Sequence, residues 1–112
     1  MSQCLFCALV ARDIPADVVA ESDLALAFRD IDPQAPTHVL VIPKRHVANA
    51  AELAAHPQDL AAVFALAGQV ADEQGLEAGY RLATNTGAEA GQSVYHAHVH
   101  LLGGRGLTWP PG

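Results

Sequence analysis

Three histidines alternate with small apolar residues near the end of the chain, at His96, His98 and His100. In a β-strand, successive side chains point to opposite faces, so alternate residues share one face and stand about 7 Å apart. Three imidazoles on one face make a poor core, but their ring nitrogens can bind a metal or attack an electrophile. The pattern predicts either a metal centre, a nucleophile with supporting groups, or both.

Two cysteines, Cys4 and Cys7, form a second group that could do chemistry. They are the only cysteines of the chain, and a C-x-x-C pair supplies half of a tetrahedral zinc site. In a reducing compartment, such a pair indicates a metal or reactive thiols rather than a structural disulfide. The spacing alone does not select the histidines that would complete the site.

The composition predicts a globular protein of the cytoplasm. The chain has 112 residues, of which 51% are hydrophobic and 16% charged, and it holds no apolar run near the roughly 18 residues of a membrane span. Met1-Ser2-Gln3 does not begin a signal-peptide pattern. A net charge of -6 argues against nucleic acid or an anionic membrane as a partner. We therefore expect one domain, residues 1–112, with neither kind of partner.

The elements that position these residues follow from hydrophobic periodicity. We expect a hairpin over 18–31, a third strand ending at Pro43, a fourth strand over 80–85 and a fifth strand in the histidine stretch. Apolar residues at helical spacing predict a long helix over 57–76, with Pro57 in its first turn and glycines near its end. Two prolines make the closing LTWPPG an extended tail. The expected fold class is α+β, a mostly antiparallel meander with one long helix packed on it.

Beyond the three histidines, most of the chain resembles the histidine triad (HIT) family, and in particular its nucleotide-binding branch. The similarity rests on FRDIDPQAPTHVLVIPKRH (28–46), GYRLATNTG (79–87), GQSVYHAHVHLLGGR (91–105) and the closing WPPG. It implies a HIT-like fold with about five strands, one long helix and a short N-terminal helix, whose sheets are joined in a homodimer. It also implies a hydrolase that cleaves phosphoramidate or acyl-phosphate links to purine nucleoside 5′-monophosphates without a catalytic cofactor.

The resemblance assigns roles to the histidine stretch. His98 is the expected nucleophile, which forms a covalent nucleotidyl-histidine intermediate, and His100 contacts the phosphate or the leaving group. An imidazole with an ordinary pKa near 6.5 is mostly neutral at pH 7 and keeps a lone pair for attack. The covalent intermediate divides one difficult displacement into two easier ones. Ser93 is expected to assist an amine leaving group, while Gly91 and Gln92 bring backbone amides to the phosphate.

Other residues match the nucleotide pocket of the family. Asp30 is expected to bind the ribose hydroxyls, and Asn85 to line the phosphate site. The candidates for the apolar walls around a purine are Phe28, Ile31 and Leu40. His38 is expected to support the triad in a role that the sequence leaves open. The loop TGAEAG (86–91) and the small Ala97 depart from the family pattern, and the loop leaves the leaving-group preference open.

The resemblance also completes the zinc site. Many bacterial members with a similar cysteine pair use the histidine after the I-P-K segment and the first histidine of the triad, here His46 and His96. A structural zinc held by Cys4, Cys7, His46 and His96 is therefore implied. His96 then serves structure and His98 catalysis, because zinc on the nucleophile would occupy the lone pair that it needs.

Three other functions stay open. The chain could be a dinucleoside polyphosphate hydrolase or nucleotidyltransferase of the same superfamily, or a non-catalytic scaffold that only binds nucleotides. Alternating histidines can also form a catalytic zinc site. Chelation separates this last case, because it would abolish turnover by a zinc hydrolase and spare a histidine nucleophile.

Overall fold

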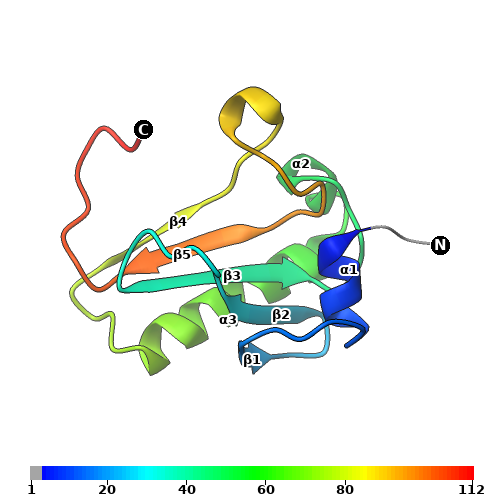
Figure 1. The fold of residues 1–112 in the computed structure, drawn as a ribbon, viewed down its shortest axis with the longest axis horizontal. Coiled ribbons are helices and arrows are strands. Elements are labelled where there is room, and N and C mark those ends of the chain that lie inside the picture. Colours follow the sequence, from blue (N-terminus) through cyan, green and yellow to red (C-terminus); the bar gives the residue numbers. More distant parts are fainter. Residues whose placement is uncertain (1–3) are drawn as a thin grey trace.

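The computed structural model describes residues 4–112 as a five-stranded sheet with a long helix against one face (Figure 1). In chain order, the elements are α1 (Leu5–Val10), β1 (Val18–Glu21), β2 (Ala25–Arg29), β3 (Thr37–Pro43), α2 (Ala50–Leu53), α3 (Pro57–Glu73), β4 (Tyr80–Ala83), η1 (Ala88–Ala90) and β5 (Val99–Gly103). The predicted α+β class, long helix and short N-terminal helix are confirmed. Residues 1–3, which carried the prediction about a signal peptide, lie outside the described residues.

The sheet differs from the predicted meander, because its strand order is β1-β2-β3-β5-β4. Both β3 and β4 are antiparallel to β5, so they run in the same direction. Strands that run in the same direction need a long crossover connection. The segment that contains α2 and α3 provides it, and the chain then returns through η1 to place β5 between the two strands. His100 of β5 therefore lies inside the sheet instead of at its edge.

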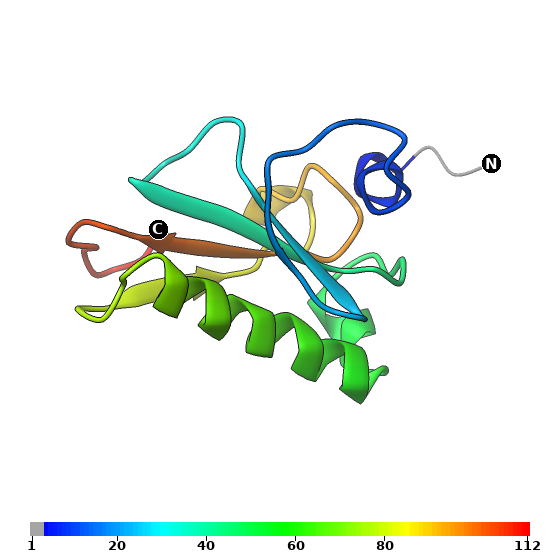
Figure 2. The same cartoon turned by 90° about the horizontal axis from the view of Figure 1, so that it is seen from below.

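Alternation along the strands divides the core into two layers. On one face, Val39 and Val41 of β3 belong to the core that α3 covers. On the other face, Leu40 and Ile42 of β3 pack with Phe6 of α1. Figure 2 shows α3 beneath the sheet and α1 on the opposite side. Since His100 pairs with Leu40, it lies on the face that carries α1.

The long helix α3 begins as predicted and ends earlier. Pro57 occupies the first helical position, where its missing N–H costs no hydrogen bond. The helix ends at Glu73 instead of Leu76, because Gly75 adopts φ 72°. The N–H of Leu76 then donates to the carbonyl of Ala71 at 3.0 Å, which closes the helix with a glycine-based cap.

The predicted strand for the histidine stretch is too long. β5 starts at Val99, so His100 alone of the three histidines lies in the regular strand. Before it the chain bends, and the N–H of Ala97 donates to the carbonyl of Val47 at 2.7 Å instead of to a neighbouring strand. The fourth strand also ends earlier than predicted, before Asn85. A bent segment, rather than an ideal strand, therefore sets the positions of the first two histidines.

The short helix α2 was not predicted, although its cap is visible in the sequence. Asn49 Oδ1 accepts a hydrogen bond from the N–H of Glu52, and Glu52 Oε1 accepts one from the N–H of Ala48, both at 3.0 Å. This arrangement resembles a capping box, except that Glu52 accepts from the residue before the N-cap Asn49. After β5, residues 104–112 form neither helix nor strand, in agreement with the extended tail predicted for 107–112. Within residues 4–112, no helix combines the length and apolar character needed to cross a membrane.

Candidate active site and metal centre

His98 lies where the chain enters β5, and its side chain is buried. Its Nδ1 is 2.8 Å from the backbone carbonyl oxygen of His96. A carbonyl oxygen only accepts, so Nδ1 carries the proton and Nε2 of the neutral ring keeps its lone pair. Thr84 holds the same segment, since its Oγ1 donates to the carbonyl of His98 at 2.8 Å. One ring nitrogen of His98 is thus fixed by the backbone and the other is available as a nucleophile.

His100 is oriented by a chain of hydrogen bonds. The N–H of Gln34 donates to Nδ1 of His38 at 3.0 Å, so neutral His38 carries its proton on Nε2. That Nε2 lies 2.9 Å from Nδ1 of His100 and 3.4 Å from Oδ2 of Asp30. His38 therefore donates to His100, whose own proton lies on Nε2. His38 thus contacts the triad directly, through His100.

Burial keeps His100 neutral. It lowers the pKa of His100 to about 4, because the imidazolium form loses hydration, and repulsion from His98 and His38 adds to this effect while Asp30 opposes it. At neutral pH, His100 is an uncharged N–H donor. Such a group can stabilise an oxygen on which negative charge builds up.

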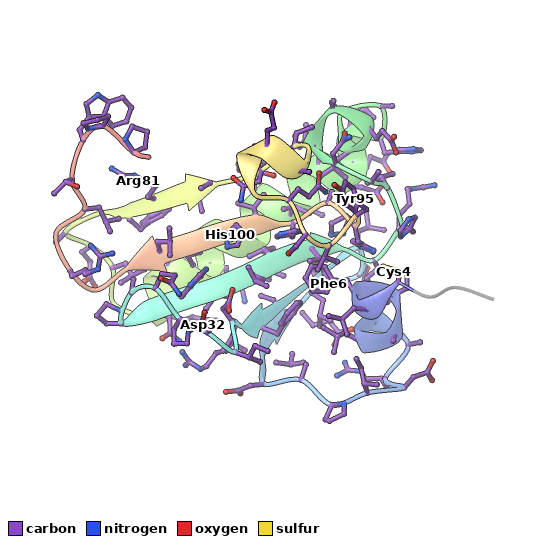
Figure 3. All side chains as sticks on the ribbon, turned by 45° about the horizontal axis from the view of Figure 1, so that its top comes forward. Cys4, Phe6, Asp32, Arg81, Tyr95 and His100 are labelled. Atoms are coloured by element: carbon purple, nitrogen blue, oxygen red, sulfur yellow. The ribbon has the colours of Figure 1, made fainter. Side chains whose placement is uncertain are left out.

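An apolar wall stands beside His98. The ring of Phe6 in α1 meets the His98 ring edge-on, with 5.1 Å between centroids, and meets the ring of Phe28 at 5.4 Å. Phe28 and Leu40, two of the predicted walls, are buried in this layer. In Figure 3, Phe6 lies between Cys4 and His100. Phe6 was not predicted as a site residue, and its apolar side chain between the cysteines of CLFC was the available signal.

The predicted ribose and purine residues at the β2–β3 loop lie at the rim of this layer. Asp30 is half-buried, and its Oδ1 accepts from the N–H of Asp32 at 2.8 Å. Ile31 differs from the other two predicted walls, since its side chain is fully exposed, at 102%. A side chain this exposed does not form the floor of a pocket.

The glycine-serine loop before the histidines places Gly91 beside Asn85, two of the predicted phosphate residues. Gly91 adopts φ 95°, which a residue with a side chain rarely does. A Cβ at this position would stand 3.9 Å from Nδ2 of Asn85, so the two residues are neighbours. Ser93 is exposed two residues further on.

Gln92 in the same loop acts as an internal brace. It is buried, and its Nε2 donates to the carbonyls of Ala48 at 2.7 Å and Val94 at 3.1 Å. Its Oε1 accepts from the N–H of Gly87 at 2.9 Å. The side chain thus shapes the loop, and a direct contact of Gln92 with a nucleotide stays a prediction.

The four predicted zinc ligands meet beside α1. The Nδ1 atoms of His46 and His96 are 3.2 Å apart. Sγ of Cys7 lies 3.3 Å from Nδ1 of His46 and 3.5 Å from that of His96, and Sγ of Cys4 lies 3.4 Å from Nδ1 of His96. The four side chains thus lie together, with their candidate ligand atoms all within 4.8 Å of one another.

These separations fit one tetrahedral zinc ion. Zinc bonds of about 2.3 Å to sulfur and about 2.0–2.1 Å to nitrogen place neighbouring ligand atoms about 3.3–3.7 Å apart. Nε2 of His96 donates to the carbonyl of Pro43 at 2.8 Å, which leaves the lone pair of Nδ1 facing the cluster. Burial lowers the pKa of His96 and so favours the neutral ring that a ligand requires.

Comparison with known proteins identifies the family. The HIT domain model matches residues 11–107. The crystal structure of a HIT family hydrolase from Legionella pneumophila Philadelphia 1 is similar, with a TM-score of 0.94 and 51% identity, and the match covers 98% of this chain and 100% of that one. The chain therefore belongs to the HIT domain family, as its sequence predicted.

Two relatives have names that bear on function. The purine nucleoside phosphoramidase of Escherichia coli K12 is 47% identical over 105 residues, which cover 92% of this chain and 88% of that protein. The 14 kDa zinc-binding protein of Zea mays is 48% identical over 116 residues, which cover 99% of this chain and 89% of that protein.

Proposed function

We propose that the chain hydrolyses phosphoramidates or acyl-nucleotides of purine nucleoside 5′-monophosphates through a covalent intermediate on His98. The observation that carries this proposal is the hydrogen bond from Nδ1 of His98 to the His96 carbonyl, because it leaves the lone pair on Nε2. The name of the Escherichia coli relative supports the choice of reaction.

In the first step, Nε2 of His98 attacks phosphorus, and a new P–N bond forms as the bond from phosphorus to the leaving amine breaks. The leaving amine takes the proton of the Ser93 hydroxyl, and the serine takes up a proton from solvent in turn. His100 donates its Nε2–H to a phosphoryl oxygen, on which negative charge builds up. In the second step, water attacks phosphorus, the bond to His98 breaks, and a proton is released. The net reaction consumes one water molecule.

The remaining predicted residues provide the nucleotide pocket in this proposal. Asp30 binds the ribose hydroxyls, and the apolar layer of Phe28 and Leu40 faces the base, with the exposed Ile31 as a cover. Asn85 and the backbone of 91–93 face the phosphate. Binding of adenosine monophosphate should weaken in Asp30→Ala, and unchanged binding would contradict the assignment of the ribose site.

We also propose that the cluster of Cys4, Cys7, His46 and His96 holds a structural zinc and that the reaction needs no catalytic cofactor. Bound zinc supplies a cross-link between α1 and the sheet. The lone pair that faces the cluster belongs to His96, whereas His98 turns its Nδ1 to a carbonyl. The name of the maize relative supports this assignment.

A homodimer in the cytoplasm, with residues 1–112 as one domain, completes the proposal. β4 is an edge strand, and such an edge presents backbone groups that another chain can pair. Tyr80 of β4 and Phe64 of α3 are 44% and 45% exposed, which provides apolar surface for a partner copy. Sedimentation should give twice the chain mass of 11.7 kDa at micromolar concentration. A monomer alone would overturn the homodimer.

The test of the reaction uses a fluorogenic adenosine phosphoramidate. Wild type should turn it over, and rapid quenching with mass spectrometry should find a nucleoside monophosphate on His98. His98→Ala should bind adenosine monophosphate without turnover. If His98→Ala keeps the wild-type rate, or no adduct forms while chelation stops the reaction, the covalent mechanism is wrong and a zinc hydrolase takes its place.

A further inference from the structure

We propose that the metal centre sets the orientation of the His98 imidazole, and that Phe6 is the positioning residue that links the two. This inference rests on the proposed function, which gives zinc to the cysteine and histidine cluster and the nucleophilic role to His98. Zinc takes no part in the reaction here. Its presence determines how firmly the His98 ring is held in the orientation needed for attack.

The first link is His96 itself. Its ring is held between two fixed points, since Nε2 donates to Pro43 at 2.8 Å and Nδ1 lies 3.4 Å from Sγ of Cys4. Its carbonyl accepts the Nδ1–H of His98. The group that ligates the metal and the group that fixes the nucleophile's tautomer therefore belong to one residue. A shift of the His96 ring moves the backbone that holds His98.

The second link is Phe6, which the sequence encloses between the two cysteine ligands. Its ring meets the His96 ring at 5.9 Å and 69°, and the His98 ring at 5.1 Å and 87°. Edge-on contacts of this kind favour one orientation of each ring. Phe6 is buried, so it occupies one side of the nucleophile and limits its rotation.

The helix that carries Phe6 depends on its anchors. α1 has six residues, far fewer than a helix needs to be stable by itself. Sγ of Cys4 accepts from the N–H of Cys7 at 3.3 Å, so the first metal ligand also caps the helix. Phe6 and Leu9 are its buried residues. Loss of the metal releases one of the two anchors of α1 and loosens the contact between Phe6 and His98.

Loss of the metal is therefore expected to leave the His98 ring less well oriented for attack. When its packing loosens, the His98 ring can rotate and place its proton on Nε2. A reacting atom misplaced by about 1 Å can cost about 10²-fold in rate. We therefore expect loss of zinc to lower kcat by tenfold or more, on the order of that effect, without abolishing turnover.

The experiment observes the His98 ring directly, without substrate. In zinc-loaded protein with ¹⁵N-labelled histidine, long-range ¹H–¹⁵N spectra should show His98 with its proton on Nδ1 alone. Removing zinc should produce a mixture of tautomers or broadened signals, and zinc added back should restore the first pattern. In Phe6→Leu the same change should appear with one zinc per chain still bound, so metal loss is not its cause.

The matched control is Leu9→Val, which alters the other buried residue of α1. It should keep the tautomer, the zinc and kcat. If stripped protein keeps the Nδ1–H pattern of His98 and its kcat within twofold of the zinc-loaded value, the coupling is wrong. If the stripped protein unfolds, Phe6→Leu decides, because it needs no metal removal, and an unchanged His98 spectrum there overturns the role of Phe6.

Failure of the underlying proposals would look different. Turnover by His98→Ala at the wild-type rate would overturn the covalent mechanism while the tautomer measurement stayed valid. A chain that takes up no zinc would overturn the metal centre and, with it, the coupling to His98.

Discussion

Two pairs of histidine rings flank His98. The difference between them shows how the same type of side chain can serve as a metal ligand or as a hydrogen-bond donor. In the cluster of cysteines and histidines, Nδ1 of His46 and Nδ1 of His96 stand 3.2 Å apart. In the relay, Nε2 of His38 and Nδ1 of His100 stand 2.9 Å apart. Two nitrogens on one tetrahedral zinc are about 3.3 Å apart, whereas 2.9 Å is the length of a hydrogen bond.

This difference depends on the backbone group that bonds the second ring nitrogen of His96 and of His38. The Pro43 carbonyl takes the N–H of His96, so the lone pair of that ring faces the cysteines. The Gln34 amide donates to His38, so the N–H of that ring faces His100. Asp30, His38 and His100 also have the donor types of a metal site. The backbone thus favours a chain of hydrogen bonds in that group and metal ligation in the cysteine cluster.

The largest expected effect comes from replacing His98, the residue between the two groups. His98→Ala should lower turnover by roughly 10⁴-fold or more, because removing the nucleophile of a hydrolase lowers kcat by factors of this order. Its zinc content and thermal stability should stay close to those of wild type. His96→Ala should lose zinc and stability. Turnover assays, elemental analysis and thermal unfolding of both variants test this, and the same outcome for both would refute the division of roles.

The same regions show what the sequence could predict. Helical spacing predicts α3 and strand composition predicts β3, since these patterns are local. The position of β5 between β3 and β4 depends on the path of a long crossover, which periodicity does not encode. The contact of His38 with His100 spans 62 positions and depends on a backbone amide, so residue types alone do not reveal it. The zinc histidines came from family resemblance rather than from spacing.

The second prediction concerns the metal centre. Cys4→Ser replaces a thiolate with a poor zinc ligand, and we expect its free energy of unfolding to fall by about 3–4 kcal/mol at free zinc 100–1,000 times the Kd. Urea unfolding with and without zinc measures the loss. Wild type in excess chelator is the control, and it should lose a similar amount, while Cys4→Ser should lose nothing more. A wild-type protein that chelation leaves equally stable would rule out a stabilising metal.

The third prediction follows from His100, which is half-buried and has a lowered pKa. Its pKa is about 4 in the folded chain, against an ordinary 6.5 when unfolded. As pH falls from 6.5 to 4, the unfolded chain binds a proton that the folded chain does not, so stability decreases. The loss attributable to this group reaches at most about 3 kcal/mol. Asp30, His38 and His98 face the same ring and remain titratable in the control.

His100→Asn is that control, because it removes the titration and keeps a polar side chain. Urea unfolding at pH 7, 5.5 and 4.5 should show a shallower loss for the variant. Parallel pH profiles would mean that His100 is not held neutral by the fold.

The fourth prediction tests the relay. His38→Phe keeps an aromatic ring but has no donor for Nδ1 of His100, so the proton of His100 is no longer fixed on Nε2. We expect turnover to fall by about 10²-fold, in the range of lost proton-donor assistance, with zinc retained. His56→Phe, which changes a histidine ahead of α3, should leave the rate unchanged. Equal rates for wild type and His38→Phe would reduce the relay to a packing feature.

The smallest expected effect lies at the C-terminal tail. Arg81 pairs with Leu102 in the sheet, so it lies on the face that carries His100. Its Nη2 donates to the carbonyl of Thr108 at 2.8 Å, and its guanidinium lies 6.0 Å from the ring of Trp109. Trp109 is 80% exposed, so deleting 109–112 removes little buried surface and should change stability by less than about 0.5 kcal/mol.

The tail should instead affect which substrate is preferred. In the proposed homodimer, it approaches the partner's site, where it would contact the leaving group rather than the reacting phosphorus. We expect the deletion to change the ratio of kcat/KM for a small-amine and a bulky-amine phosphoramidate by a few-fold, about 1 kcal/mol or less. Arg81→Met, which releases the tail without removing it, should shift the ratio in the same direction. If both variants keep the wild-type ratio, selectivity resides within the sheet and its loops, and the histidine regions alone set the chemistry.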